Sequence, residues 1–198
     1  MAAEEPCYEV ERRDGVIELR RYGPQIVAQV RVPGTIEVAG NRAFDPLFRY
    51  ISGANRARAE IPMTAPVTQS PAGQKIPVTA PVTTEGDEGQ WTVSFLMPRA
   101  YTLDTLPEPT DPRVELREIP AHRVAAIRYA GRWTRSSYEA HRRRLVEWTA
   151  TQRLIPTGPP IWARYNSPFT PPGWRRNEIW IPVEEAETPS GRARPEPR

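Results

Sequence analysis

The chain has 198 residues, of which 27 are Lys or Arg and 24 are Asp or Glu, so its formal net charge is +3 at pH 7. A nucleic-acid-binding protein concentrates its basic residues on one face, whereas here they are mixed with acidic residues throughout, so we expect no nucleic-acid partner. No apolar run approaches the roughly 18 residues of a transmembrane helix, and we expect no membrane insertion. The single cysteine cannot form an internal disulfide, which is typical of a reducing compartment such as the cytoplasm.

Both ends of the chain are predicted to be flexible. Residues 1–6 carry no apolar core, and residues 184–198 are rich in proline and charge with no apolar residue larger than alanine. Such segments bury too little apolar surface to offset the entropy lost on ordering. The length between them fits one domain, which we place at residues 7–183.

A segment of seventeen residues occurs twice without a gap. "ELRRYGPQIVAQVRVPG" begins at Glu18 and "ELREIPAHRVAAIRYAG" begins at Glu115, an offset of 97 residues (115 − 18). We infer an internal duplication, with pseudo-repeats at about 7–98 and 112–183. The seven identical pairs are Glu18/Glu115, Leu19/Leu116, Arg20/Arg117, Val27/Val124, Ala28/Ala125, Arg31/Arg128 and Gly34/Gly131.

Each copy predicts two strands. In the first copy, apolar and polar residues alternate over residues 16–20 and 26–32. This is the pattern of an antiparallel pair of strands, here joined by a turn at Gly23 and Pro24. The second copy is expected to turn at Pro120.

Apolar residues then recur with the period of an α-helix in both copies. In the first, positions 44, 47, 48 and 51 form one stripe, and Gly53 is a natural stop. Pro46 is expected to kink this helix or to begin its second part. In the second, Ser136 or Ser137 is the candidate N-cap, and the stripe consists of Tyr138, Leu145 and Trp148.

Further strands follow each helix. "IPMTAPVT" at residues 61–68 recurs as "IPVTAPVT" at residues 76–83, and both alternate apolar residues with prolines and hydroxyls. This predicts neighbouring strands at an edge of the sheet. Residues 91–98, together with segments beginning at 161 and 177, supply the remaining strands, so each half has the order β-β-α-β-β.

In this order the segments resemble the SOUL haem-binding protein family. The resemblance implies an α+β fold in which a duplicated β-β-α-β-β unit forms a distorted antiparallel β-barrel with two flanking α-helices. It also implies non-covalent binding of a tetrapyrrole, haem b or free protoporphyrin, for buffering, transport or sensing. The matching segments, between about residues 8 and 183, are "YEVERRDGVIELRRYGP", "NRAFDPLFRYISGAN", "IPMTAPVT", "FLMPRAYTLDTLPEPTDPRVELREIP" and "RYNSPFTPPGWRRNEIWIPV".

The resemblance implies a ligand wall on the first helix. In some family members haem lies against this helix face, which here carries Phe44, Leu47 and Phe48, with Arg49 as the base beside them. A porphyrin is flat and largely apolar with two propionates, so it requires an apolar wall with cations at its rim. The alternative is that this stripe belongs to the core.

The loop before the last strand is a second part of the implied site. Phe169, Trp174 and Arg175 lie in or next to the motif "PPGWRRNEIW". In the family, the loop that precedes this motif has been placed near the ligand. An arginine there can hold a propionate bidentately. Alternatively, the Arg, Asn and Glu residues of this motif form a hydrogen-bonded network that braces the last strand. Met63 adds a thioether to the candidate set, unless it only fills the core.

Axial ligation of haem iron requires an imidazole, thiolate or thioether. His141 is the candidate metal ligand. It lies on the stripe of the second helix and aligns with Phe44, so the alternative is an ordinary half-buried side chain. Some family members carry a histidine at the position of Arg21, which this chain lacks, and we therefore expect weak or no axial ligation.

Two other functions remain open. The related duplicated fold occurs in effector-binding modules of bacterial regulators that hold small, often cationic molecules. By that analogy this chain would be a small-molecule sensor that uses Glu178 or another carboxylate against a cationic ligand. The other is a tetrapyrrole-modifying enzyme, although the sequence shows no nucleophile with a neighbouring base and no familiar catalytic motif. We expect a binding protein without catalytic residues.

Overall fold

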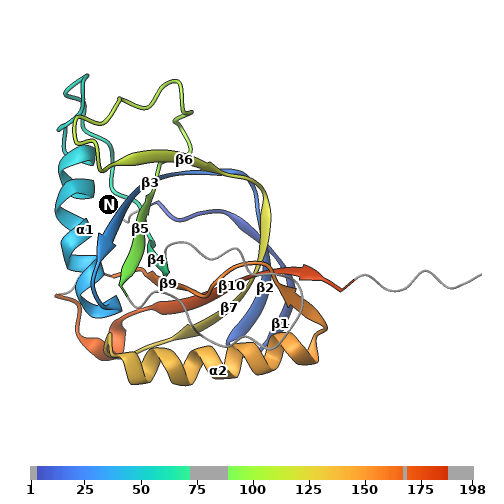
Figure 1. The fold of residues 1–198 in the computed structure, drawn as a ribbon. Coiled ribbons are helices and arrows are strands. Elements are labelled where there is room, and N and C mark those ends of the chain that lie inside the picture. Colours follow the sequence, from blue (N-terminus) through green and yellow to red (C-terminus); the bar gives the residue numbers. More distant parts are fainter. Residues whose placement is uncertain (1–3, 72–88, 167–168, 187–198) are drawn as a thin grey trace, which may run out of the picture.

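The computed structural model describes residues 4–71, 89–166 and 169–186 (Figure 1). Residues 76–83, predicted as the second proline-rich strand, lie outside the described residues, and so do residues 187–198 of the predicted tail. The elements in chain order are β1 (Tyr8–Asp14), β2 (Ile17–Tyr22), β3 (Gln25–Pro33), α1 (Ile36–Ile51), β4 (Val67–Pro71), β5 (Gln90–Leu96), β6 (Glu115–Ile119), β7 (His122–Tyr129), α2 (Arg135–Thr151), β8 (Leu154–Pro156), β9 (Ile161–Arg164), a 3-10 turn η1 (Pro172–Trp174) and β10 (Asn177–Glu185).

The described strands form one antiparallel sheet of ten strands. Its order is β1-β2-β7-β10-β9-β4-β5-β3-β6, and β8 pairs with β10 off this path. The sheet curls around itself, but β1 and β6 at its two ends are not paired with each other, so it is a distorted, open barrel (Figure 1). The two helices lie outside the curl, which confirms the predicted α+β class.

The predicted pairing of strands within each copy is wrong. β2 does not pair with β3 across Gly23 and Pro24, and β6 does not pair with β7; instead, β2 pairs with β7 and β3 pairs with β6. The first strand of each copy therefore joins the other copy, and the two halves of the sheet are β2-β7-β10-β9 and β6-β3-β5-β4. Alternation shows which side chains share a face, but it does not specify the partner strand.

α1 covers the outer face of β3, β4 and β5. It runs through Pro46 without a break, and Gly53 follows its end with a φ of 97°. Because successive side chains of a strand point to opposite faces, only every second residue of each strand meets the helix. The buried residues of this layer include Ala43, Leu47 and Ile51 of α1 and Ala28, Val30, Val32, Val93 and Phe95 of the strands.

α2 covers the outer face of β7, β8 and β10. Its predicted stripe is buried as expected, at Tyr138, Leu145 and Trp148. The predicted N-cap is corrected, because Ser136 and Ser137 already lie inside the helix. The N-cap is Thr134, which has an extended backbone, and its Oγ1 accepts a hydrogen bond from the Ser137 amide at 3.3 Å.

Candidate ligand-binding sites

The solvent side of α1 carries two neighbouring phenylalanines. The rings of Phe44 and Phe48 stack with their centroids 5.4 Å apart, and Phe44 also meets Phe95 of β5 edge-on at 5.7 Å. Phe44 is 40% exposed and Phe48 is 45% exposed. Leu47, which the sequence placed in the same ligand wall, is fully buried in the core beneath the helix. The exposed part of the predicted wall is therefore the phenylalanine pair.

Arg49 is exposed one residue after this pair. Its Nε donates a hydrogen bond to Asp45 Oδ1 at 3.1 Å, one helical turn earlier. Arg49 also lines a cavity of about 430 Å³ between the end of α1 and the segment that holds Asp111 and Arg113. The hydrogen bonds from Arg113 lower the pKa of Asp111 to about 2, so this carboxylate is ionised at neutral pH. The cations beside α1 are therefore balanced by two acids.

The other predicted ligand contacts come from separate segments. Met63 is exposed between α1 and β4, and Phe169 and Trp174 are exposed between β9 and β10. The guanidinium of Arg175 does not extend into solvent. It lies 4.4 Å from the centre of the Trp133 ring, and its Nε donates to the Thr170 carbonyl at 2.7 Å.

His141 takes part in the packing of α2 on β7. Its ring stacks on Tyr129 with the centroids 4.0 Å apart, and its Nδ1 lies 2.7 Å from the carbonyl oxygen of Ser137. In residues 4–71, 89–166 and 169–186, no group of three or more His, Cys, Asp or Glu side chains is arranged to hold a metal ion. Among those same residues no helix is long and apolar enough to cross a membrane.

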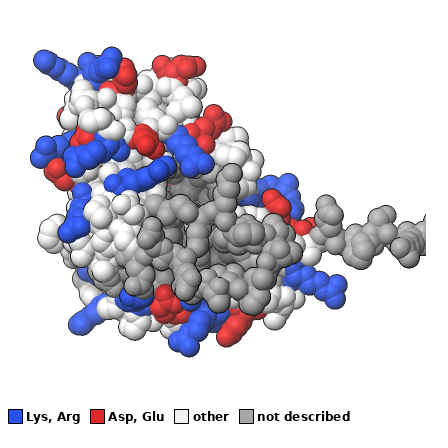
Figure 2. All heavy atoms as spheres, in the orientation of Figure 1, with Lys and Arg blue, Asp and Glu red and all other residues white. Residues whose placement is uncertain are grey.

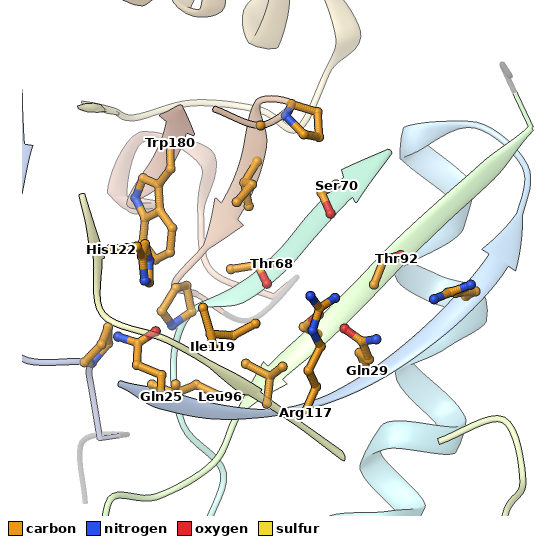
Figure 3. Close-up of a pocket in the computed structure, with 18 of the residues that line it drawn as sticks. Gln25, Gln29, Thr68, Ser70, Thr92, Leu96, Arg117, Ile119, His122 and Trp180 are labelled. Atoms are coloured by element: carbon orange, nitrogen blue, oxygen red, sulfur yellow. The ribbon is translucent and has the colours of Figure 1, made fainter. Parts of the chain in front are cut away.

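A cavity of about 780 Å³ lies on the inner face of the sheet (Figure 3). Its walls are the alternate residues of β3 and β5 that point away from α1, so the helix and the cavity occupy opposite faces of the same strands. His122 and Trp180 stand together at one side, and Arg117 projects into the cavity near Gln29 (Figure 3). The residues from β3 and β5 are Gln25, Val27, Gln29, Arg31, Gln90, Thr92, Ser94 and Leu96.

Sequence reasoning missed this cavity. A signal was present, because β3 and β5 carry Gln, Arg, Thr and Ser at alternate positions opposite their apolar face. Such a polar face is ordinarily solvated. Only the curl of the sheet turns it into the wall of a cavity.

The inner face of the other half of the sheet is filled by a charged network around Glu178. Arg20 donates to its two carboxylate oxygens at 2.6 and 3.2 Å. Burial by itself would raise the pKa of Glu178, but the hydrogen bonds and charge of Arg20 outweigh it and hold that pKa below its usual value. The remaining donors to this carboxylate are Arg176 at 2.9 and 3.1 Å, Trp180 at 2.7 Å and Tyr165 at 3.1 Å.

The Glu178 network has two consequences for the predictions. Both carboxylate oxygens are occupied by internal donors, so Glu178 offers no free charge to a cationic ligand of a sensor module. Arg176 braces the last strand, as one of the two interpretations of its motif expected.

Elsewhere, acidic and basic side chains are interspersed over the described surface shown in Figure 2.

The fold is a duplicated α+β domain with one cavity on the inner face of its sheet and a smaller one at the end of α1. The chain belongs to the SOUL heme-binding protein family, whose model matches residues 3–182. It is 27% identical over 175 residues to "Heme-binding protein 1" of Xenopus tropicalis, covering 85% of each chain.

Solved structures with the same fold are more distant in sequence. The C-terminal domain of EcmrR has a TM-score of 0.63 at 14% identity, covering 90% of this chain and 99% of that one. A hydrolase encoded by lin2189 from Listeria innocua has a TM-score of 0.60 at 12% identity, covering 85% and 91% respectively. At such identities the similarity shows the fold alone.

Proposed function

We propose that this chain binds haem b or free protoporphyrin non-covalently at the outer surface of α1. The observation that carries the proposal is the stacked pair of Phe44 and Phe48, which is about half exposed, whereas Leu47 and Ile51 of the same stripe are buried. A flat, largely apolar macrocycle gains most from an open aromatic wall of this kind. Membership of a heme-binding family supports the choice of ligand.

Arg49 is the proposed partner of a propionate. Its present partner is Asp45, and both side chains are well exposed, so their ion pair contributes no more than about 1 kcal/mol. Arg49 can therefore exchange Asp45 for a propionate at small cost, and a bidentate Arg-carboxylate pair is the stronger interaction. Met63, Phe169, Trp174 and Arg175 remain candidate contacts around the macrocycle.

Axial ligation is weak or absent in this proposal. His141 lies on α2, stacked against Tyr129, rather than on α1. The affinity then comes from apolar contact and propionate pairing, so protoporphyrin without iron binds about as tightly as hemin. We propose a role in tetrapyrrole buffering, transport or sensing rather than in catalysis, in a reducing compartment such as the cytoplasm, which the single cysteine supports.

An absorbance titration with hemin and protoporphyrin side by side tests this function. The wild-type chain is expected to give a saturable Soret shift with both ligands. The double substitution Phe44→Ser with Phe48→Ser should weaken both at least about tenfold, which corresponds to about 1.4 kcal/mol of lost apolar contact. Val146→Ser, which alters a similarly exposed apolar residue on α2, is the matched control and should change neither. Absence of a saturable shift in the wild type would refute the function, and an unchanged double variant would refute the site.

A further inference from the structure

The two halves of the sheet place the same residues at equivalent positions. Arg20 stands opposite Val124 in the pairing of β2 with β7. In the other half, Arg117 stands opposite Val27, and both members of this pair are identical to their counterparts 97 residues away. Arg117 is therefore the structural counterpart of Arg20.

The same register identifies the counterpart of Glu178. In the pairing of β10 with β7, Glu178 stands opposite Arg128. In the pairing of β5 with β3, Thr92 stands opposite Arg31, the residue identical to Arg128 in the duplication. Where one half has a buried carboxylate, the other half therefore has a threonine, and the internal partner of the arginine is missing.

Arg117 lacks the partners that Arg20 has. Among residues 4–71, 89–166 and 169–186, no side chain forms an ion pair or hydrogen bond with the guanidinium of Arg117 or of Arg31. Glu115, the counterpart of Glu18, accepts a hydrogen bond from Gln29 at 3.1 Å, whereas Glu18 pairs with Arg20 at 2.7 Å. Both Arg117 and Arg31 line the inner cavity of about 780 Å³.

Aromatic side chains fill the inner face of one half, whereas the described residues that line the cavity in the other half are mostly polar. Tyr22 and Trp180 are buried around the Arg20 network, with Tyr8 and Tyr165 packed beside them. Glutamine, threonine and serine occupy much of the wall around Arg117. The cavity also has apolar wall residues, namely Trp180, Ile161, Leu96 and Ile119.

We propose that this inner cavity is a second binding site, for an amphipathic organic carboxylate. The ligand carboxylate pairs with Arg117, in the role that Glu178 has toward Arg20 in the other half, and Arg31 adds a second positive charge. The apolar body of the ligand packs against Trp180 and Ile161. The site lies on the opposite face of β3 and β5 from α1, so it does not depend on the proposed tetrapyrrole site.

Calorimetric titration with naphthalene-1-acetate tests the site, with naphthalene-1-acetamide as the uncharged ligand of the same shape. The acetate is expected to bind saturably and at least about tenfold more tightly than the amide. Arg117→Gln should weaken acetate binding at least about tenfold. Arg128→Gln is the matched control, because Arg128 is the exposed counterpart of Arg31 and does not line the cavity. Absence of saturable acetate binding, or equal binding of the amide, would overturn the proposal.

Substitution of Thr92 gives an independent test. Thr92→Glu installs a carboxylate at the position equivalent to Glu178, opposite Arg31, and should abolish binding of naphthalene-1-acetate, whereas Thr92→Gln should keep it within about threefold of wild type. Without ligand, Thr92→Glu should melt at a higher temperature than Thr92→Gln at pH 7, since it gains an internal ion pair. Hemin titration of both variants should match wild type, which separates this site from the one on α1. Acetate binding retained by Thr92→Glu would contradict the assignment of Arg117.

Discussion

Arg20 and Glu178, 158 residues apart in the sequence, form a buried ion pair with Nη1 and Oε2 separated by 2.6 Å. Their side chains are 3% and 0% exposed. Desolvating two charges is costly, and the pair is favourable only because further donors complete the shell of the carboxylate. The guanidinium of Arg20 also lies 4.3 Å from the centre of the Tyr8 ring. The pair thereby joins the strand of one copy to the last strand of the other.

Removing the charge of Glu178 is expected to destabilise the fold strongly. Glu178→Gln removes the fully buried anion that Arg20 and Arg176 share and leaves them only the more exposed Glu18 and Glu5. We expect a loss of about 3 kcal/mol in the free energy of unfolding, measured in urea. Glu185→Gln breaks the exposed pair with Arg12 and should cost less than about 1 kcal/mol. Similar losses in the two variants would contradict the role of the buried network.

Replacing the N-cap threonine by alanine is expected to lower the free energy of unfolding by different amounts in the two helices. Thr134 Oγ1 accepts a hydrogen bond from Ser137, whereas the side chain of Thr35, the N-cap of α1, makes no capping bond. Thr134→Ala should therefore lower the free energy of unfolding by about 1 kcal/mol. Thr35→Ala should cost less than half as much. Chemical denaturation of both variants checks this, and an equal loss would show that the bond to Ser137 contributes nothing.

Substitution by glycine is expected to stabilise the protein at one position just after α2 and to destabilise it at another position inside this helix. Arg153 follows the helix with a φ of 56°, a left-handed conformation that costs an L residue roughly 1 kcal/mol and glycine almost nothing. Arg153→Gly should therefore raise the thermal midpoint. Arg143 is exposed in the interior of α2, where the same substitution should cost about 1 kcal/mol. A lower midpoint for Arg153→Gly would show that its side chain makes a contact worth more than the strain.

Stability should fall in alkaline solution. Burial raises the pKa of Tyr50 to about 12 from its ordinary value of 10.0. The folded state holds the Tyr50 proton more tightly than the unfolded state does, so its contribution to the free energy of unfolding is fully present below pH 10. This contribution is lost as the pH rises toward 12, by up to about 1.4 kcal/mol per pH unit. Tyr50→Phe should show a shallower decline in the free energy of unfolding over this range. An identical slope would mean that Tyr50 does not carry the effect, since Tyr129, whose pKa burial also raises to about 12, remains in both proteins.

His141→Ala should change hemin binding little. The ring of His141 stacks on Tyr129 in the α2 layer, so its loss should lower the thermal midpoint while the hemin affinity and the Soret maximum stay within about twofold and a few nanometres of wild type. Absorbance titration measures the affinity and the Soret position. A loss of more than about a hundredfold would establish His141 as an axial ligand.

The predicted helix stripe shows how far periodicity reaches. It correctly placed residues 44, 47, 48 and 51 on one side of α1, yet Leu47 and Ile51 are buried and the two phenylalanines are about half exposed. A period of 3.6 residues identifies a face about a quarter to a third of a turn wide. How much of that face is covered depends on where the sheet lies beneath the helix, and this is a non-local property.

The local pattern of this sequence was sufficient to predict its duplication, most of its strand and helix segments and its family. Alternation and helical spacing act between near neighbours, so they can be recognised without knowing the rest of the chain. Only the tertiary structure decided that the first strands exchange partners, that Arg20 meets Glu178, and that Arg117 faces a cavity instead. These outcomes depend on contacts between segments about a hundred or more residues apart, which no short window of sequence contains.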